Sequence, residues 1–236
     1  MALGYEAVQP LAKRPISSSG PAFALAFRMR YALQLGGAAL LFWLSTLPVR
    51  NDYAPALEEQ VFRLLNDLPG ILFGPVWAFM QFGNFVAVPV VMALALALKR
   101  VRAVLGFALV GAGKWFGARI VKTLVVRHRP ATFLADVAVR DPSGSGQAFV
   151  SGHAVIAVGL AVVASPYVPA RWRPVLWALA AIVCLGRVYV GAHLPLDVVG
   201  GAALGWALGA LAHVLLGPSP RLARGAPGSE RRGRTR

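Results

Sequence analysis

The sequence predicts an all-α integral membrane protein built as a bundle of six transmembrane helices. The first reason is composition: 57% of the 236 residues are hydrophobic and 14% are charged, well below the quarter that is typical of soluble domains. The second reason is that apolar stretches long enough to cross a bilayer recur along the chain, with room for about six. The third is the placement of the basic residues, which gather in segments of one membrane side.

The first half of the chain is predicted to hold two spans and a surface helix. Residues 1–24 are polar and are expected to form a cytoplasmic tail rather than a signal peptide, because the apolar run comes late. That run, at 31–49, is the predicted span 1. Residues 50–70 carry acidic residues and leucines at helical spacing, which predicts a short interfacial amphipathic helix, although a helix packed on the bundle has the same pattern. Span 2 is predicted at 71–98, and its prolines indicate a bend.

Four more spans are predicted in the second half, at residues 101–126, 149–168, 174–190 and 196–216. The last residues, 218–236, have six arginines and one glutamate and are predicted to be a disordered, basic, cytoplasmic tail. The membrane domain is therefore expected to cover residues 25–217.

Four clusters of basic residues predict the orientation. They lie in the N-terminal segment, at 99–102, at 171–173 and in the C-terminal tail, and together hold 15 of the 24 lysines and arginines. Six spans place all four clusters on one side, which the positive-inside rule makes the cytoplasm of the cell (inner) membrane. Both termini are then cytoplasmic. The net charge of +15 would suggest nucleic acid in a soluble protein, but here it follows from this distribution, so no nucleic-acid partner is expected.

Three polar motifs lie at the predicted extracytoplasmic ends of spans 3 to 6. They are Lys122 with Arg129-Pro130, then Ser151-Gly152-His153, then Arg187 with His193 and Asp197. Because successive spans alternate in direction, all three motifs are expected to meet at one membrane face. Charged residues are costly in a membrane and mark functional sites.

The chemistry of these residues favours phosphate. Three cations, a hydroxyl and the N–H groups of a helix start together suit a tetrahedral oxyanion. Asp197 can orient His193 and stabilise its imidazolium form, which makes His193 the better nucleophile. His153 lacks such a partner and is the candidate general acid. The sequence has no cluster of carboxylates or Cys/His with metal-ligand spacing, so no metal or cofactor is expected, and the cations would replace metal charge.

The motifs K-x6-RP, SGH and R-x5-H-x3-D, in this order, resemble the type 2 phosphatidic acid phosphatase (PAP2) superfamily. Its members include membrane lipid phosphatases, glucose-6-phosphatase and vanadium haloperoxidases. The resemblance implies that His193 forms a phosphohistidine, with Asp197 as its partner and His153 as the acid. It implies phosphate-holding roles for Lys122, Arg129, Ser151, Gly152 and Arg187. Two positions depart from the pattern, since Val150 replaces a usual proline and Gly186 an occasional serine.

The predicted function is hydrolysis of a lipid phosphate or diphosphate, because the site lies where lipid headgroups lie. An isoprenyl diphosphate such as undecaprenyl diphosphate is the first choice. Phosphatidylglycerophosphate, phosphatidic acid and a lipid A phosphate are alternatives. A non-catalytic transporter or scaffold on the same fold is the alternative from another class, and the intact motifs argue against it. Membrane lipids are the expected surroundings, and the sequence indicates no oligomeric state.

Two further residues are secondary candidates. Lys114, Arg119 and Lys122 share one face of span 3. Arg119, with or without Lys114, is therefore a candidate for a cavity below the phosphate cage, where it could hold a second phosphate. The alternatives are that Arg119 bonds polar groups of span 2, or that Lys114 snorkels. His128 could touch substrate or be a solvated loop histidine.

Overall fold

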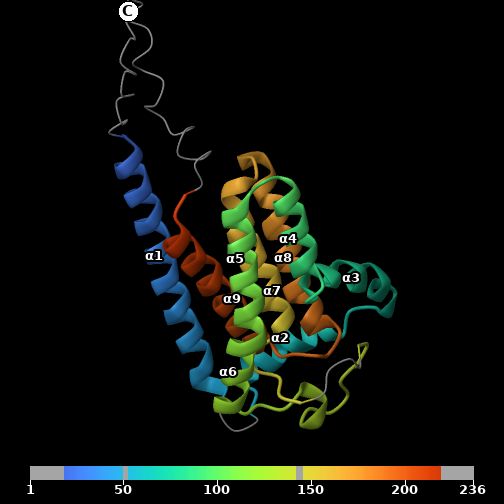
Figure 1. Cartoon of the computed structure of the whole chain (residues 1–236). Helices are drawn as coiled ribbons and strands as arrows, with labels where there is room; N and C mark the ends of the chain where they lie inside the picture. Colours follow the sequence, from blue (N-terminus) through green and yellow to red (C-terminus); the bar gives the residue numbers. More distant parts are fainter. Residues whose placement is uncertain (1–18, 50–52, 142–145, 219–236) are drawn as a thin grey trace, which may run out of the picture.

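The computed structural model describes residues 19–49, 53–141 and 146–218, and all regular elements in these ranges are helices (Figure 1). The longer ones are α1 (Ser19–Thr46), α2 (Ala56–Asn66), α3 (Phe73–Met80), α4 (Ala87–Ala97), α5 (Val101–Ala112), α6 (Ala118–Leu124), α7 (Gly152–Ala164), α8 (Arg173–Tyr189) and α9 (Pro195–Leu216). A π-helical turn, Gly113–Gly117, joins α5 to α6. Most of both predicted tails lies outside the described residues.

The first helix is longer than predicted. Helix α1 begins at Ser19 rather than near residue 31, so residues 19–24 of the predicted tail belong to it. Arg28 and Arg30 are exposed within this helix. Long basic side chains can lay their stems along apolar surface and keep their charges in water, so these two arginines do not end the helix.

Within the part of the chain that the structure describes, four helical segments are long and apolar enough to cross a membrane: Pro21–Val49, Val101–Leu124, Ala170–Tyr189 and Pro195–Leu216. A fifth is obtained if the pair formed by Gly70–Gly83 and Ala87–Ala97 is counted as one bent span. Helix α7 with its following turn is apolar but shorter. Every residue of α7 from 154 to 163 is buried, and Figure 1 shows this helix inside the bundle. The prediction of six spans therefore remains a prediction, with α7 as the sixth.

The predicted span 2 is broken at its middle. The two halves are inclined by 59°, and Figure 1 shows α3 projecting from the side of the bundle while α4 runs along it. The break falls at residues 84–86, directly after the 3-10 turn Gln81–Gly83, rather than at a proline. A Cβ atom on Gly83 would lie 2.6 Å from Val183 Cγ1 and 2.9 Å from the His153 carbonyl oxygen. The break therefore lies against the start of α7, where only glycine allows so close an approach.

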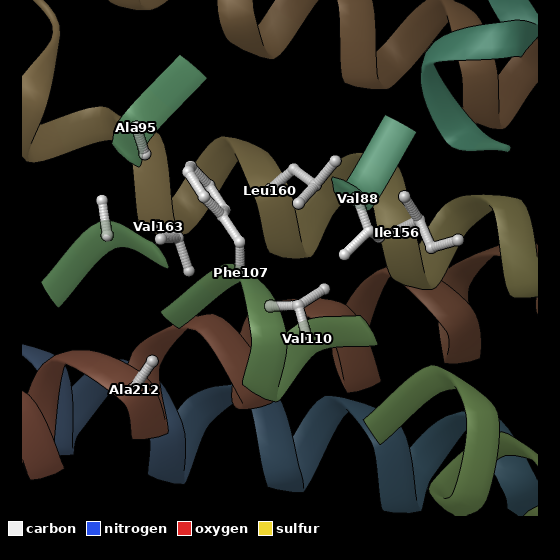
Figure 2. Packing of buried hydrophobic residues seen from close by; sticks show 9 residues of the cluster. Val88, Ala95, Phe107, Val110, Ile156, Leu160, Val163 and Ala212 are labelled. Atoms are coloured by element: carbon white, nitrogen blue, oxygen red, sulfur yellow. The ribbon is translucent and has the colours of Figure 1, made fainter. Parts of the chain in front are cut away.

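One apolar cluster fills the space between α4, α5, α7 and α9. Figure 2 shows its side chains pointing toward one another, with those of α5 between the other three helices. Its members are Val88, Ala95, Ala103, Phe107, Val110, Ile156, Leu160, Val163 and Ala212. This packing holds α5 against α7. Because the π-helical turn and α6 continue directly from α5, it also sets their position relative to α7.

Helices α7 and α9 approach unusually closely along a stripe of glycines on α9. A Cβ atom on Gly205 would lie 2.3 Å from the Val155 carbonyl oxygen, and one on Gly201 would lie 2.5 Å from the Ser151 carbonyl oxygen. Small residues at such interfaces let backbones meet. The Ser151 N–H also donates to the Asp197 carbonyl at 3.0 Å. The second and third motifs are thus joined at the ends of these two helices.

Helix α2 packs on the bundle by one face. Glu58, Phe62 and Asn66 are buried at intervals of four residues, whereas Leu57 and Leu64 are more than 70% exposed. The Asn66 side chain donates to the Ala138 and Tyr189 carbonyls and accepts from the Ala138 N–H. The helix is therefore packed on the bundle, which is one of the two predicted alternatives, and its leucines point outward. An interfacial position remains a prediction.

Candidate active site

A pocket of about 440 Å³ lies where α6, α7 and α8 end or begin. It is lined by Gly83, Asn84, Phe85, Lys114, Lys122, Arg129, Gly146, Gln147, Gly152, His153, Ile156, Arg187 and His193. The structure therefore brings residues of all three motifs around one space. Ser151 and Asp197 are fully buried beside it.

The three motif cations of the pocket come from three parts of the chain. Lys122 lies in α6 and its Nζ donates to the Gln147 carbonyl, with the Ala148 carbonyl at 3.4 Å. Arg129 is extended because proline follows it, and its Nη1 donates to the Ala192 carbonyl at 2.8 Å. Arg187, near the end of α8, donates to Asp141 Oδ2 at 2.8 Å.

Several buried donors at this site have no hydrogen-bond partner among the residues that the structure describes. They include the Nε atoms of Arg129 and Arg187 and the Ser151 hydroxyl. Buried polar groups are normally satisfied, and each exception needs an explanation. Charged donors of this kind bind a phosphate oxygen well, and both arginines line the pocket.

The start of α7 supplies the second histidine. Gly152 and His153 are its first residues, and both line the pocket. The first N–H groups of a helix have no partner within the helix and form a ready site for an anion. Within the described residues His153 makes no hydrogen bond and no ion pair, which leaves its imidazole available to a ligand.

His193 lies between the pocket and Asp197. Its Nδ1 is 3.7 Å from Asp197 Oδ2, an ion-pair separation that is too long for a direct hydrogen bond. Because Nδ1 faces the carboxylate, Nε2 is the nitrogen left for a ligand. Burial lowers the pKa of His193 to about 4, with Arg187 and Arg129 acting in the same direction and Asp197 opposing them. The imidazole is therefore neutral at pH 7.

Asp197 is held in the first turn of α9. Its Oδ2 accepts the Leu194 N–H at 2.9 Å, and Pro195 occupies the first helical position. Proline is favoured there because its missing N–H costs nothing, and a carboxylate near a helix start is stabilised by the helix dipole. The sequence thus sets the position of Asp197 locally.

A buried ion network behind Asp197 was missed by the sequence reasoning. Arg127 is fully buried, and its Nη1 donates to Asp197 Oδ1 at 3.1 Å and to Glu58 Oε1 at 3.0 Å. Its Nη2 donates to Glu58 Oε2 at 2.6 Å. Burial alone would lower the pKa of Arg127, but Glu58 and Asp197 outweigh it and leave the pKa raised. Glu58 also accepts the Leu196 N–H at 2.9 Å, which ties α2 to α9.

One signal in the sequence could have revealed this network. Glu58 shares a helical face with Phe62 and Asn66, at intervals of four residues, and all three side chains are buried. A carboxylate on the buried face of an amphipathic helix calls for a basic partner. The partner itself was not predictable, since Arg127 lies 69 residues further along the chain.

Neither of the two secondary candidates lines the pocket, whereas Lys114 does. Arg119 does not line it, and its guanidinium lies 5.0 Å from the centre of the Trp115 ring. His128 is exposed and is not among the lining residues. Lys114, in the π-helical turn, does line the pocket.

An apolar helical bundle with a pocket of cations and two histidines at its helix ends defines a membrane protein of phosphatase type. The chain belongs to the PAP2 superfamily: residues 99–220 match the model of that family, which is more than half of the chain. Helices α1 to α4 precede the matched segment. The apolar helices and the relatives described next support a membrane phosphatase.

Three relatives are similar to this chain. The undecaprenyl-diphosphatase of Sulfolobus acidocaldarius is 32% identical over 154 residues, which cover 62% of this chain and 72% of the relative. The crystal structure of LpxE from Aquifex aeolicus has a TM-score of 0.63 and 26% identity, over 68% of this chain and 96% of that one. A PAP2 type phosphatidylglycerolphosphate phosphatase from Bacillus subtilis has a TM-score of 0.61 and 20% identity, over 77% and 95%. The last likeness concerns the fold alone.

Proposed function

We propose that the protein hydrolyses a lipid diphosphate or phosphate through a phosphohistidine at His193. One observation carries this proposal: His193, His153 and the three cations of the motifs line the same pocket. The neutral His193 imidazole offers a lone pair there, which a nucleophile needs. Lys122, Arg129 and Arg187 supply the positive charge that metal ions supply in other phosphatases, so the reaction is proposed to need no metal.

In the first step Nε2 of His193 attacks the phosphorus atom of the substrate. A P–N bond forms, and the P–O bond to the leaving group breaks with its electron pair on the leaving oxygen. His153 donates a proton to that oxygen. Asp197 stabilises the imidazolium that develops on His193, and the cations stabilise the charge on the equatorial oxygens.

In the second step water hydrolyses the phosphohistidine. His153, which has lost its proton, takes one from the attacking water. The new P–O bond forms as the P–N bond breaks and returns the electron pair to His193. Orthophosphate leaves, and both histidines regain their starting protonation states.

We propose an isoprenyl diphosphate of the undecaprenyl type as the substrate. The relative at 32% identity is named an undecaprenyl-diphosphatase, which supports this choice over phosphatidylglycerophosphate, phosphatidic acid and a lipid A phosphate. A non-catalytic transporter or scaffold is the alternative from another class. The complete set of pocket residues speaks against it.

We also propose six spans, with both termini in the cytoplasm and the pocket at the extracytoplasmic face of the cell membrane. Helix α7 and the bent pair α3–α4 would complete the count. The basic residues at the bundle end opposite the pocket support this orientation.

The direct test is phosphate release by the protein purified in detergent with EDTA present. The panel contains isoprenyl diphosphate, isoprenyl monophosphate, phosphatidylglycerophosphate, phosphatidic acid and a lipid A phosphate. Wild type is expected to have its highest kcat/KM with isoprenyl diphosphate. His193→Ala should lose at least about 1,000-fold in kcat. His128→Ala, which changes an exposed histidine outside the pocket, is the matched control and should remain active.

Each part of the proposal has its own contradicting result. Turnover by His193→Ala at the wild-type rate would overturn the mechanism. Loss of wild-type activity on adding EDTA would overturn metal independence. A highest kcat/KM with another lipid would reassign the substrate, and no activity on any lipid would favour the non-catalytic alternative.

A further inference from the structure

Lys114 is a cation of the pocket that the three motifs do not include. It lies eight positions before Lys122 in the helical segment formed by α5, the π-helical turn and α6. Eight positions correspond to about 12 Å along a helix axis. It therefore belongs to the interior of a membrane-spanning segment. Its Cε nevertheless lies 3.2 Å from where a Cβ atom on Gly152 would stand. The side chain thus reaches from the bilayer interior to the start of α7.

The ammonium group of Lys114 has no anionic partner in the described part of the chain. It makes no ion pair or hydrogen bond there, and its nearest charge-stabilising groups are the rings of Phe85 and Trp115, at 5.1 and 5.6 Å. Aromatic faces stabilise a cation only in part. A charge in a membrane segment without a counter-ion is costly and marks a functional site, and π-helical turns such as the one that carries Lys114 are frequent at such sites.

The pocket has enough cationic side chains to bind two anionic groups rather than one. Lys122, Arg129 and Arg187 line it with His193, and Lys114 lines it as a further cation, 5.1 Å from the centre of the Phe85 ring. The volume of about 440 Å³ lies in the range of pockets that hold whole small molecules. Phe85 and Trp115 pack together at 5.6 Å, and both are about 40% exposed on the bundle surface. Lys114 therefore lies beside an exposed aromatic surface of the bundle.

We propose that Lys114 binds the lipid-linked phosphate of a lipid diphosphate. This inference rests on the proposed function and names the substrate class that the site takes. The lipid chain would lie along the Phe85–Trp115 surface, the phosphate attached to it at Lys114, and the terminal phosphate among the three cations beside His193. When the bond to the terminal phosphorus breaks, the leaving lipid monophosphate gains negative charge, which Lys114 stabilises.

The experiment compares isoprenyl diphosphate with isoprenyl monophosphate of the same chain length. Values of kcat/KM are measured for wild type, Lys114→Met, Lys114→Arg and Arg119→Met. Lys114→Met keeps the length of the side chain and removes its charge. Arg119→Met is the matched control, because it removes a cation that also contacts Trp115 but does not line the pocket.

The quantity that decides is the ratio of kcat/KM for the diphosphate to kcat/KM for the monophosphate. Loss of one charge-assisted contact should lower this ratio by about tenfold to 100-fold in Lys114→Met. Lys114→Arg should restore most of it, and Arg119→Met should leave it at the wild-type value. An unchanged ratio in Lys114→Met would overturn the inference, as would an equal fall in Arg119→Met.

Inhibition of the wild-type protein gives a second measurement that needs no folded variant. Methylenediphosphonate should compete with the substrate at least about tenfold better than methylphosphonate. Equal inhibition would overturn the second phosphate subsite. A wild-type protein that hydrolyses monophosphates but not diphosphates would overturn this inference and the diphosphate substrate, and would leave the phosphohistidine mechanism in place. A wild-type protein inactive on all lipid phosphates would overturn the proposed function, and the subsite with it.

Discussion

At the scale of single residues, Asp197 has two neighbours that hold it in different ways. The Leu194 N–H donates a hydrogen bond to one carboxylate oxygen, and Arg127 donates one to the other. Arg127 also donates to the Glu58 carboxylate. Removing one member of a buried ion network leaves the others uncompensated. We therefore propose Glu58 and Arg127 as positioning residues that act on His193 through Asp197.

Glu58→Gln tests this positioning role. The substitution keeps the size of the side chain and removes its charge, so Arg127 is expected to shift and Asp197 to lose its orientation. We expect kcat to fall by about tenfold to 100-fold, with little change in KM, because the phosphate-binding cations are untouched. Steady-state kinetics with the preferred lipid give both constants.

A matched control for this variant lies next to it in the chain. Glu59→Gln removes an exposed ion pair with Arg63, whose side chains are 28% and 40% exposed. Surface pairs contribute at most about 1 kcal/mol, so this control should match wild type in kcat. Equal effects of the two substitutions, or a rise in KM alone, would contradict the positioning role of Glu58.

The pKa of His193 predicts the acid side of the pH profile. Burial lowers that pKa to about 4, and the nucleophile acts only when neutral. Activity should therefore fall as the pH drops through about 4, and protonation of His193 should not limit it between pH 6 and 8. The pH dependence of kcat/KM with a diphosphate substrate measures this ionisation in the free enzyme. An acid limb near pH 6.5, the ordinary value for histidine, would contradict it.

At the scale of elements, the glycine stripe of α9 sets the distance to α7 and hence between the two histidines. A Cβ atom on Gly205 would meet the Val155 carbonyl oxygen at 2.3 Å, and this backbone atom can yield only if the helices separate. Gly205→Ala should lower the free energy of unfolding by about 1–3 kcal/mol and reduce kcat. Thermal unfolding in detergent and kinetics give the two readouts.

The control for this substitution is Gly36→Ala in α1, where nothing lies within 4 Å of the added Cβ atom. Alanine favours a helix over glycine by up to about 1 kcal/mol, so this variant should be as stable as wild type or more so. Equal stability of Gly205→Ala and Gly36→Ala would show that the α7–α9 contact does not set the packing distance.

Most elements could be predicted because apolar length and composition are local properties. All six apolar segments are helices in the structure. The start of α1 was missed because Arg28 and Arg30 remain exposed without ending the helix. The position of the break, directly after Gly83, was missed because its cause is tertiary: Gly83 lies against Val183 and His153, far along the chain.

At the scale of the whole molecule, alternation of the spans was enough to predict that the three motifs meet. Residues of all three line the pocket. The sequence could not predict the Glu58–Arg127–Asp197 network, because its members lie 69 and 70 residues apart. It also could not separate Lys114 from Arg119, which share a helix face, because the π-helical turn changes where each side chain points.

The proposed orientation can be measured with two matched alanines at opposite ends of the bundle. Ala131 and Ala170 are both exposed, one in the loop after Arg129 and the other before α8. In a Cys184→Ser background, which removes the one native cysteine, Ala131→Cys should react with an impermeant maleimide in intact cells. Ala170→Cys should react only after permeabilisation. The reverse pattern would contradict a pocket at the extracytoplasmic face.

The central claim is that His193 carries the phosphoryl group during turnover. Its most direct test is to mix the protein with isoprenyl diphosphate, quench in alkali and locate phosphate on peptides by mass spectrometry. We predict phosphate on His193 and none in His193→Ala. Phosphate on another residue, or product release at the wild-type rate by His193→Ala, would contradict the mechanism.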